Sequence, residues 1–211
     1  MINLISMGSD IGNITVNVFN AIIEADIIVN YDNIDLSDLD TYIKDKEIIA
    51  NGLEEQNEVS IGLDESESID ETGDIYSKLE ESYLKIELAI SRSQDNNVAL
   101  ICSNKRNIYG IANLLIQMSS KHSDIELKIY PAVSPIDYSS AVLGAPLNDF
   151  VAIDLNNHLV SDKELRNKIK FALKNDFVLF IHNPIGDNGD KGNFNILKEV
   201  MDDFSNELLA L

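Results

Sequence analysis

Two polar turns hold the residues of this chain that are best suited to binding a small molecule. One spans residues 8–12, with a glycine at each end, after the apolar run 2–7; the other spans residues 103–107, after the apolar run 98–102. Both precede a helical pattern, and ligands of α/β proteins gather where strands end and helices begin. Glycine permits close backbone approach, and a helix N-terminus favours anionic groups. Ser6 prevents a GxGxxG match, and a plain surface turn is the alternative for residues 103–107.

Metal and nucleophile chemistry find little support in the residue types and their spacing. The histidines His122, His158 and His182 lie in separate segments without HExxH spacing, which argues against a metal site. The single cysteine, Cys102, excludes an internal disulfide framework and a CxxC zinc site, and its apolar neighbours predict a small buried side chain. No Ser–His–Asp triad can be identified from spacing, so the sequence assigns no catalytic residue.

Composition and charge limit the classes of partner. Hydrophobic residues make up 45% of the 211 residues, which is typical of a globular protein. The 16 Lys and Arg against 36 Asp and Glu give a formal net charge of −20. This charge repels phosphate backbones and anionic lipid surfaces, so we expect neither nucleic-acid nor membrane binding. Because no apolar run approaches the ~18 residues of a membrane span, and no basic segment of a signal peptide is present, we expect a soluble, cytoplasmic protein.

Strand and helix patterns alternate along the chain, which is typical of a parallel α/β sheet. Short apolar runs predict strands at residues 2–7, 26–29, 98–102, 127–130, 150–155 and 177–181. Helical spacing predicts helices after Gly12, over 76–92, 108–119 and 134–143, from the 161–164 capping box to about 175, and from about 194. In the helix over 76–92, the residues expected on the buried face are Leu79, Tyr83, Ile86 and Ile90.

The chain is expected to form two α/β domains, residues 1–130 and 131–211, with a ligand cleft between them. Residues 53–75 differ in composition from the rest of the first domain. They hold nine acidic residues and no basic one, with few apolar residues and no sustained period. This composition favours a solvated loop inserted into the domain, and a partner-binding segment is the alternative.

Four segments match one protein family in collinear order. Residues 25–31, ADIIVNY, are similar to A-D-V-I-V-G-Y, and residues 108–112, IYGIA, to the end of S-S-G-D-A-G-I-Y-G-M-A. Residues 143–150, LGAPLNDF, are similar to L-L-G-A-P-L-G-H-D-F, and Asn183 and Pro184 fall where the family has L-Y-N-P. The chain therefore resembles the S-adenosylmethionine-dependent tetrapyrrole methyltransferases of cobalamin biosynthesis, within them most nearly the precorrin-3B (cobalt-precorrin-3) C-17-methyltransferases.

The resemblance implies two α/β domains of the tetrapyrrole methylase type with an inter-domain cleft, and a homodimer. It also implies transfer of a methyl group from S-adenosylmethionine to C-17 of a tetrapyrrole precursor, with ring contraction. Methyl transfer depends mainly on holding the donor carbon in line with the ring carbon, so the expected site consists of binding residues. By position, the resemblance assigns cofactor binding to Gly8, Ser103, Asn104, Ile108, Tyr109, Val133, Ser134, His182 and Asn183.

The chain departs from the family pattern in its cofactor loops and at its C-terminal end. The first loop keeps only Gly8 of G-x-G-P-G, Asn104 and Lys105 replace a Gly-Asp pair, and residues 131–135, PAVSP, replace P-G-V-T-A. A side chain at Asn104 hinders backbone approach, and Lys105 opposes a cationic ligand. The sequence ends before the family's last strands, so we expect a shortened second domain. Two interpretations stay open, an active methyltransferase and a non-catalytic relative that binds tetrapyrroles or other proteins.

Overall fold

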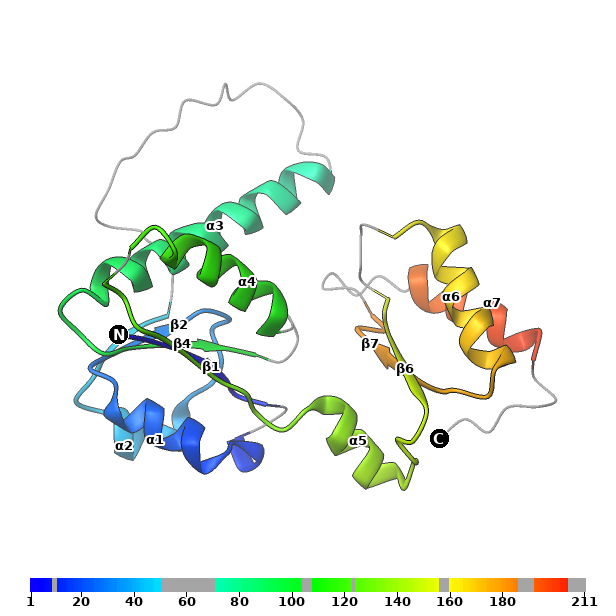
Figure 1. Ribbon diagram of the computed structural model, residues 1–211, viewed down its shortest axis with the longest axis horizontal. Helices are drawn as coiled ribbons and strands as arrows, with labels where there is room; N and C mark the ends of the chain where they lie inside the picture. The colour runs from blue at the N-terminus through cyan, green and yellow to red at the C-terminus, as the bar shows by residue number, and fades with distance from the viewer. Residues whose placement is uncertain are drawn as a thin grey trace. The chain divides into compact units, whose positions relative to one another are not determined.

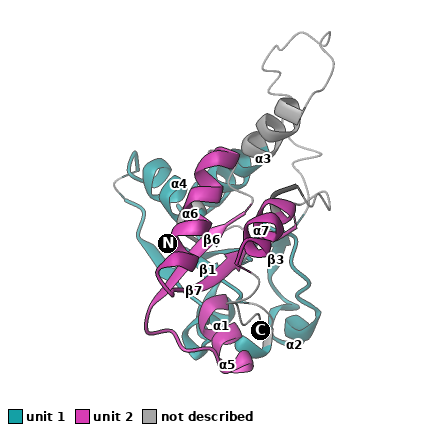
Figure 2. Cartoon of the chain, turned by 90° about the vertical axis from the view of Figure 1, so that its right-hand side faces the viewer, with its two compact units in different colours: residues 1–134 teal, residues 135–211 magenta. Residues whose placement is uncertain are grey.

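The computed structural model describes residues 1–8, 11–50, 71–103, 108–122, 124–155, 160–185 and 192–204. It divides into two compact units, Met1–Ser134 and Pro135–Leu211, which Figure 2 shows in teal and magenta. The division falls after Ser134, whereas the sequence-based boundary falls after Tyr130. Each unit is described below by itself.

The described part of the first unit is built on a five-stranded parallel sheet in the order β3-β2-β4-β1-β5. Residues opposite each other include Ser6 and Cys102 on β1 and β4, and Asn30 and Ile101 on β2 and β4. Because every pairing is parallel, the carboxyl ends of all these strands lie at one edge of the sheet. The α/β class predicted from the sequence is confirmed. The strands are β1 (Ile2–Ser6), β2 (Ile27–Asn30), β3 (Glu47–Ile49), β4 (Val98–Cys102) and β5 (Leu127–Tyr130).

Helices cover both faces of this sheet (Figure 1). The 3-10 helices η1 (Ile11–Asn13) and η2 (Ser37–Leu39) and the helices α1 (Val16–Glu24) and α2 (Asp40–Ile43) belong to one side. The helices α3 (Glu71–Arg92) and α4 (Ile108–Ser119) pack on the other. Helix α1 begins after Thr15, whose Oγ1 accepts a hydrogen bond from the Val18 amide at 3.2 Å. This bond satisfies one of the free amides of the first helical turn.

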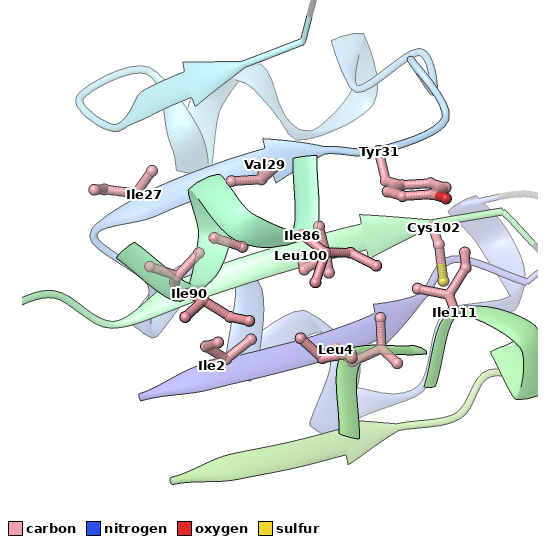
Figure 3. Close-up of a cluster of buried hydrophobic side chains, with 13 residues drawn as sticks. Ile2, Leu4, Ile27, Val29, Tyr31, Ile86, Ile90, Leu100, Cys102 and Ile111 are labelled. Carbon is pink, nitrogen blue, oxygen red and sulfur yellow. The ribbon is translucent and has the colours of Figure 1, made fainter. Parts of the chain in front are cut away.

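Burial on both faces explains why β4 is a continuous apolar run and why β1 is mostly apolar, with Asn3 and Ser6 as its polar residues. All five residues of each strand are buried. Leu4 and Leu100 face α3 and α4, as Figure 3 shows. Ile5 and Ile101 point to the opposite face, where they join the core under α1. Two layers of apolar side chains therefore hold the central strands in place.

The structure corrects two expectations about the first unit. Tyr83, expected on the buried face of its helix, is 50% exposed, whereas Lys85 is only 8% exposed. Helix α3 begins at Glu71, so residues 71–75 of the expected acidic loop are helical, and most of that loop, residues 51–70, lies outside the described residues. The short elements α2 and β3 were not predicted, because three or four residues are too few to show a period.

The described part of the second unit is a two-stranded parallel sheet with helices against it. Helices α6 and α7 pack on one face through Leu165, Ile169 and Leu197. Ser161 caps α6 by accepting a hydrogen bond from the Glu164 amide at 3.3 Å, which confirms this helix start as predicted. The elements are α5 (Pro135–Leu143), β6 (Phe150–Asp154), α6 (Asp162–Lys174), β7 (Val178–His182) and α7 (Gly192–Asp202).

Neighbouring residues of α4 provide a matched test of this core. Leu115 is fully buried, whereas Ile116 is 48% exposed. We expect Leu115→Ala to lower the free energy of unfolding by about 2–5 kcal/mol, since it removes apolar contacts and leaves a cavity. Ile116→Ala should change it by less than about 1 kcal/mol. Urea denaturation measures both values, and equal losses would contradict the packing of α4 on this sheet.

Candidate functional site

The carboxyl edge of the five-stranded sheet is the candidate site in the first unit. The chain leaves β1 through α1 on one face, toward β2, and leaves the adjacent β4 through α4 on the other face, toward β5. Two adjacent strands whose connections depart on opposite faces form a switch point, where ligands of open α/β sheets bind. Gly8 follows β1 and Ser103 follows β4, so the two predicted turns flank this switch point.

Gly8 combines two properties that suit it to this position. Its φ of 75° lies in the left-handed region, which favours glycine. The amide before it, that of Met7, donates a hydrogen bond to the Cys102 carbonyl at 3.0 Å. The turn after β1 is thus tied to β4, and Gly8 adds no side chain that would cover the edge.

Ser103 is held by a residue that the sequence analysis did not identify. Asp32, just after β2, accepts hydrogen bonds through Oδ2 from the Ser103 amide at 2.7 Å and from Ser103 Oγ at 2.9 Å. Both donors of Ser103 therefore meet one carboxylate oxygen. A polar residue at the carboxyl end of the second predicted strand was the available signal for Asp32.

The segment that carries Asp32 is fixed on several sides. Asn30 Oδ1 accepts from the Ile34 amide at 2.8 Å, and Asn30 Nδ2 donates to the Ile34 carbonyl at 2.7 Å. Lys85 Nζ of α3 donates to the Tyr31 carbonyl at 2.9 Å and lies 2.8 Å from Glu81 Oε1. A small polar cavity of about 150 Å³ opens among these groups; it is lined by Tyr31, Asp32, Asn33, Glu81, Ser82 and Lys85.

The remaining predicted residues of the first unit are only partly described. Val133 and Ser134 follow β5, the neighbour of β1, so they lie at the same edge; Val133 is 37% exposed. Ile108 and Tyr109 open α4, but their side chains lie outside the described residues. Asn104 itself lies outside them. The structure therefore brings Gly8, Ser103 and the residues after β5 to one edge.

His182 and Asn183 belong to the second unit, at the carboxyl end of β7. The His182 ring contacts the Phe180 ring edge-on, with centroids 4.7 Å apart. Asn183 has a φ of 48°, in the left-handed region that asparagine tolerates, and its Nδ2 donates to Asp154 Oδ1 at 3.1 Å. Asp154 ends β6, opposite His182. These polar groups lie at the carboxyl end of their strands, as Gly8 and Ser103 do in the first unit.

Two further features of the described residues bear on function. No group of three or more His, Cys, Asp or Glu side chains among them is placed to hold a metal ion. None of the described helices combines the length and apolar character that crossing a membrane requires.

The fold and the edge define the class of protein: an α/β protein whose parallel sheet has a switch point, the place where ligands of such sheets bind. The particular family follows from comparison with known proteins. The chain belongs to the tetrapyrrole (corrin/porphyrin) methylases, whose family model matches residues 1–207.

Individual relatives agree with this family. A protein of Methanothermobacter thermautotrophicus named "Probable cobalt-factor III C(17)-methyltransferase" is 27% identical over 187 residues, which cover 88% of this chain and 46% of the relative. A Salmonella typhimurium protein of the same name is 35% identical over 109 residues, 51% of this chain and 44% of the relative. The matched region thus covers less than half the length of each of these relatives. The crystal structure of the methyltransferase CobJ shares the fold, with a TM-score of 0.63, 18% identity and coverage of 99% of this chain and 76% of that one.

Cys102, at the end of β4, provides a chemical test of how closed this edge is. Burial, with a further contribution from the nearby Asp32 carboxylate, raises the pKa of the thiol from 9.0 to about 12. We expect iodoacetamide at pH 8 to modify the folded protein at least about a hundredfold more slowly than the urea-unfolded chain, because the thiolate is the reactive form. Mass spectrometry of this single cysteine measures both rates, and similar rates would contradict its burial.

The same pKa shift sets a pH window for stability. Above pH 9 the unfolded chain releases the thiol proton while the folded chain keeps it, so the free energy of unfolding falls. The stability that the protonated thiol contributes is fully present below the pKa of the unfolded chain. It is lost as the pH rises from there toward the pKa of the folded chain, by up to about 1.4 kcal/mol per pH unit. A Cys102→Ala variant should show a smaller loss over that range in urea denaturation, whatever its stability at pH 7.

Proposed function

We propose that this protein is a cytoplasmic methyltransferase that moves a methyl group from S-adenosylmethionine to C-17 of a tetrapyrrole precursor in cobalamin biosynthesis. The observation that carries the proposal is the switch-point edge, where Gly8 and Ser103 follow adjacent strands in a chain of the tetrapyrrole methylase family. The names of the relatives support the position that is methylated. Ring contraction is proposed on the same resemblance.

The described residues fit a cofactor of this kind in part. S-adenosylmethionine supplies an electrophilic methyl group on a sulfonium centre. Gly8 leaves room for backbone contact, and Ser134 follows β5, the strand that pairs with β1. We assign these residues, with Ser103, Asn104, Ile108, Tyr109, Val133, His182 and Asn183, to cofactor binding. Their role is to hold the donor carbon in line with the ring carbon, which requires orientation more than acid–base chemistry.

Cofactor affinity is the property that separates an active enzyme from a non-catalytic relative. The side chain of Asn104 and the charge of Lys105 each weaken binding by an amount on the order of 1–3 kcal/mol. We therefore expect the unmodified chain to bind S-adenosylhomocysteine weakly or not measurably by calorimetric titration. The double variant Asn104→Gly, Lys105→Asp should bind at least about tenfold more tightly.

A charge-matched control accompanies this titration. Lys121→Asp changes the net charge by the same amount, but Lys121 lies beyond the end of α4, away from the carboxyl edge. It should leave the affinity unchanged. Micromolar binding by the unmodified chain would show that Asn104 and Lys105 cost little and would favour the active enzyme. No binding by the unmodified chain or the double variant would instead favour the non-catalytic relative.

We also propose a homodimer that forms through the edge of β7 that faces away from β6, which pairs with no other strand of the described residues. The ladder to β6 uses the backbone of alternate residues, as shown by the bonds from the Val178 amide to the Asp149 carbonyl and from the Leu155 amide to the His182 carbonyl, both 3.0 Å. The backbone groups of Leu179 and Ile181 therefore point away from β6. A two-fold axis at Phe180 pairs Leu179 of one copy with Ile181 of the other, and an exposed strand edge favours such pairing.

Two substitutions at one position test this dimer. Leu179→Pro removes an outward amide that β6 does not use, whereas Leu179→Ala removes a similar amount of side chain and keeps the amide. We expect sedimentation velocity at micromolar concentration to give a dimer for the unmodified chain and Leu179→Ala, and a monomer for Leu179→Pro. A monomeric unmodified chain, or a dimeric proline variant, would contradict the proposal.

A further inference from the structure

We infer that Asp32 is a positioning residue of the cofactor site, which holds the start of the loop after β4 through Ser103. This inference rests on the proposed function for what the loop binds. The hydrogen bonds between Asp32 and Ser103 are observed in the structure and do not depend on that function. None of the family segments matched in the sequence includes Asp32, and the site residues assigned by the resemblance do not include it either.

The first step is the geometry of the anchor. Asp32 Oδ2 lies 2.7 Å from the Ser103 nitrogen and 2.9 Å from Ser103 Oγ. A carboxylate that accepts two donors from one residue fixes both the backbone and the side-chain rotamer of that residue. Such charge-assisted hydrogen bonds are stronger than bonds between neutral groups. Ser103 is the last described residue after β4, so fixing it sets the point from which the chain leaves this strand.

The second step is that Asp32 itself has little freedom. The Tyr31 amide before it donates to the Ile101 carbonyl of β4 at 2.9 Å. The Tyr31 carbonyl accepts from Lys85 Nζ, which reaches it from α3 and lies 5.9 Å from the centre of the Tyr31 ring. After it, Asn33 adopts a φ of 52°. The carboxylate is therefore presented by a segment that β4 and α3 both hold.

The third step concerns the chemistry of the edge. A site for a cationic methyl donor benefits from a nearby negative charge, and Lys105 stands where the resembled family has an acid. Asp32 places a carboxylate directly against Ser103, which stands two residues before Lys105 in the sequence. Asp32 thus fixes Ser103 and adds negative charge at the end of β4 in a chain that lacks the resembled family's own acid.

The test compares two aspartates of one segment. Asp35 also binds a backbone amide through its carboxylate, that of Ser37 at 3.0 Å, but it does not contact Ser103. We expect Asp32→Ala to speed hydrogen exchange of the Ser103 amide at least about tenfold, and Asp35→Ala to leave it unchanged. Asp32→Asn keeps one acceptor oxygen and should give an intermediate rate. Unchanged exchange at Ser103 in Asp32→Ala would overturn the anchor.

Ligand affinity is the second readout. The background is the form that binds S-adenosylhomocysteine, either the unmodified chain or the Asn104→Gly, Lys105→Asp variant. In that background, Asp32→Ala should weaken binding about tenfold to a hundredfold, and Asp32→Asn should weaken it less. Asp35→Ala should leave it unchanged, and equal losses for Asp32→Ala and Asp35→Ala would overturn the positioning role. If neither form binds the ligand, the proposed function fails, and with it the positioning role; the exchange rates still decide whether Asp32 anchors Ser103.

Discussion

The parallel pairing of β1 with β4 is the interaction on which the rest of the first unit depends. It sets Ser6 opposite Cys102 and thereby brings the ends of two strands far apart in the sequence to one edge. Every residue of both strands is buried, so a slip of one position would move side chains from one core layer into the other and disrupt the packing of both. The hydrophobic core therefore fixes, to within a residue, where Gly8 and Ser103 stand relative to each other.

Charged groups at this edge are tolerated because each one has partners. Lys85 is almost fully buried on α3, and an isolated ammonium there would be costly. The Tyr31 carbonyl and the Glu81 carboxylate compensate it. Asp32 is compensated in turn by the two donors of Ser103. Hydrogen bonds thus link α3 to the end of β2, and the end of β2 to the end of β4. The apolar core packs the same three elements against one another.

How far the sequence predicts this molecule depends on the range of the interaction involved. The strand 98–102 was predicted at its observed bounds, because burial on both faces leaves a run of apolar residues that can be read directly. The strand 127–130 was also predicted at its observed bounds, although none of its residues is buried. The exposed position of Tyr83 and the buried Lys85 were not predicted, since the partner of Lys85 is a carbonyl 54 residues away. The contact between Asp32 and Ser103 needs the strand order, in which β4 lies between β2 and β1, and local periodicity does not contain that order.

The groups that build the fold and those that would hold a cofactor are largely separate in this chain. The core strands use Leu4, Leu100 and their neighbours, none of which lies in a loop. The departures from the family pattern include Asn104 and Lys105, which directly follow the anchored Ser103 in the sequence. Substitutions outside the packed core change ligand affinity with little effect on the free energy of unfolding. The chain can therefore keep the tetrapyrrole methylase fold whether or not it binds the methyl donor tightly, which is why affinity, and not fold stability, tests its function.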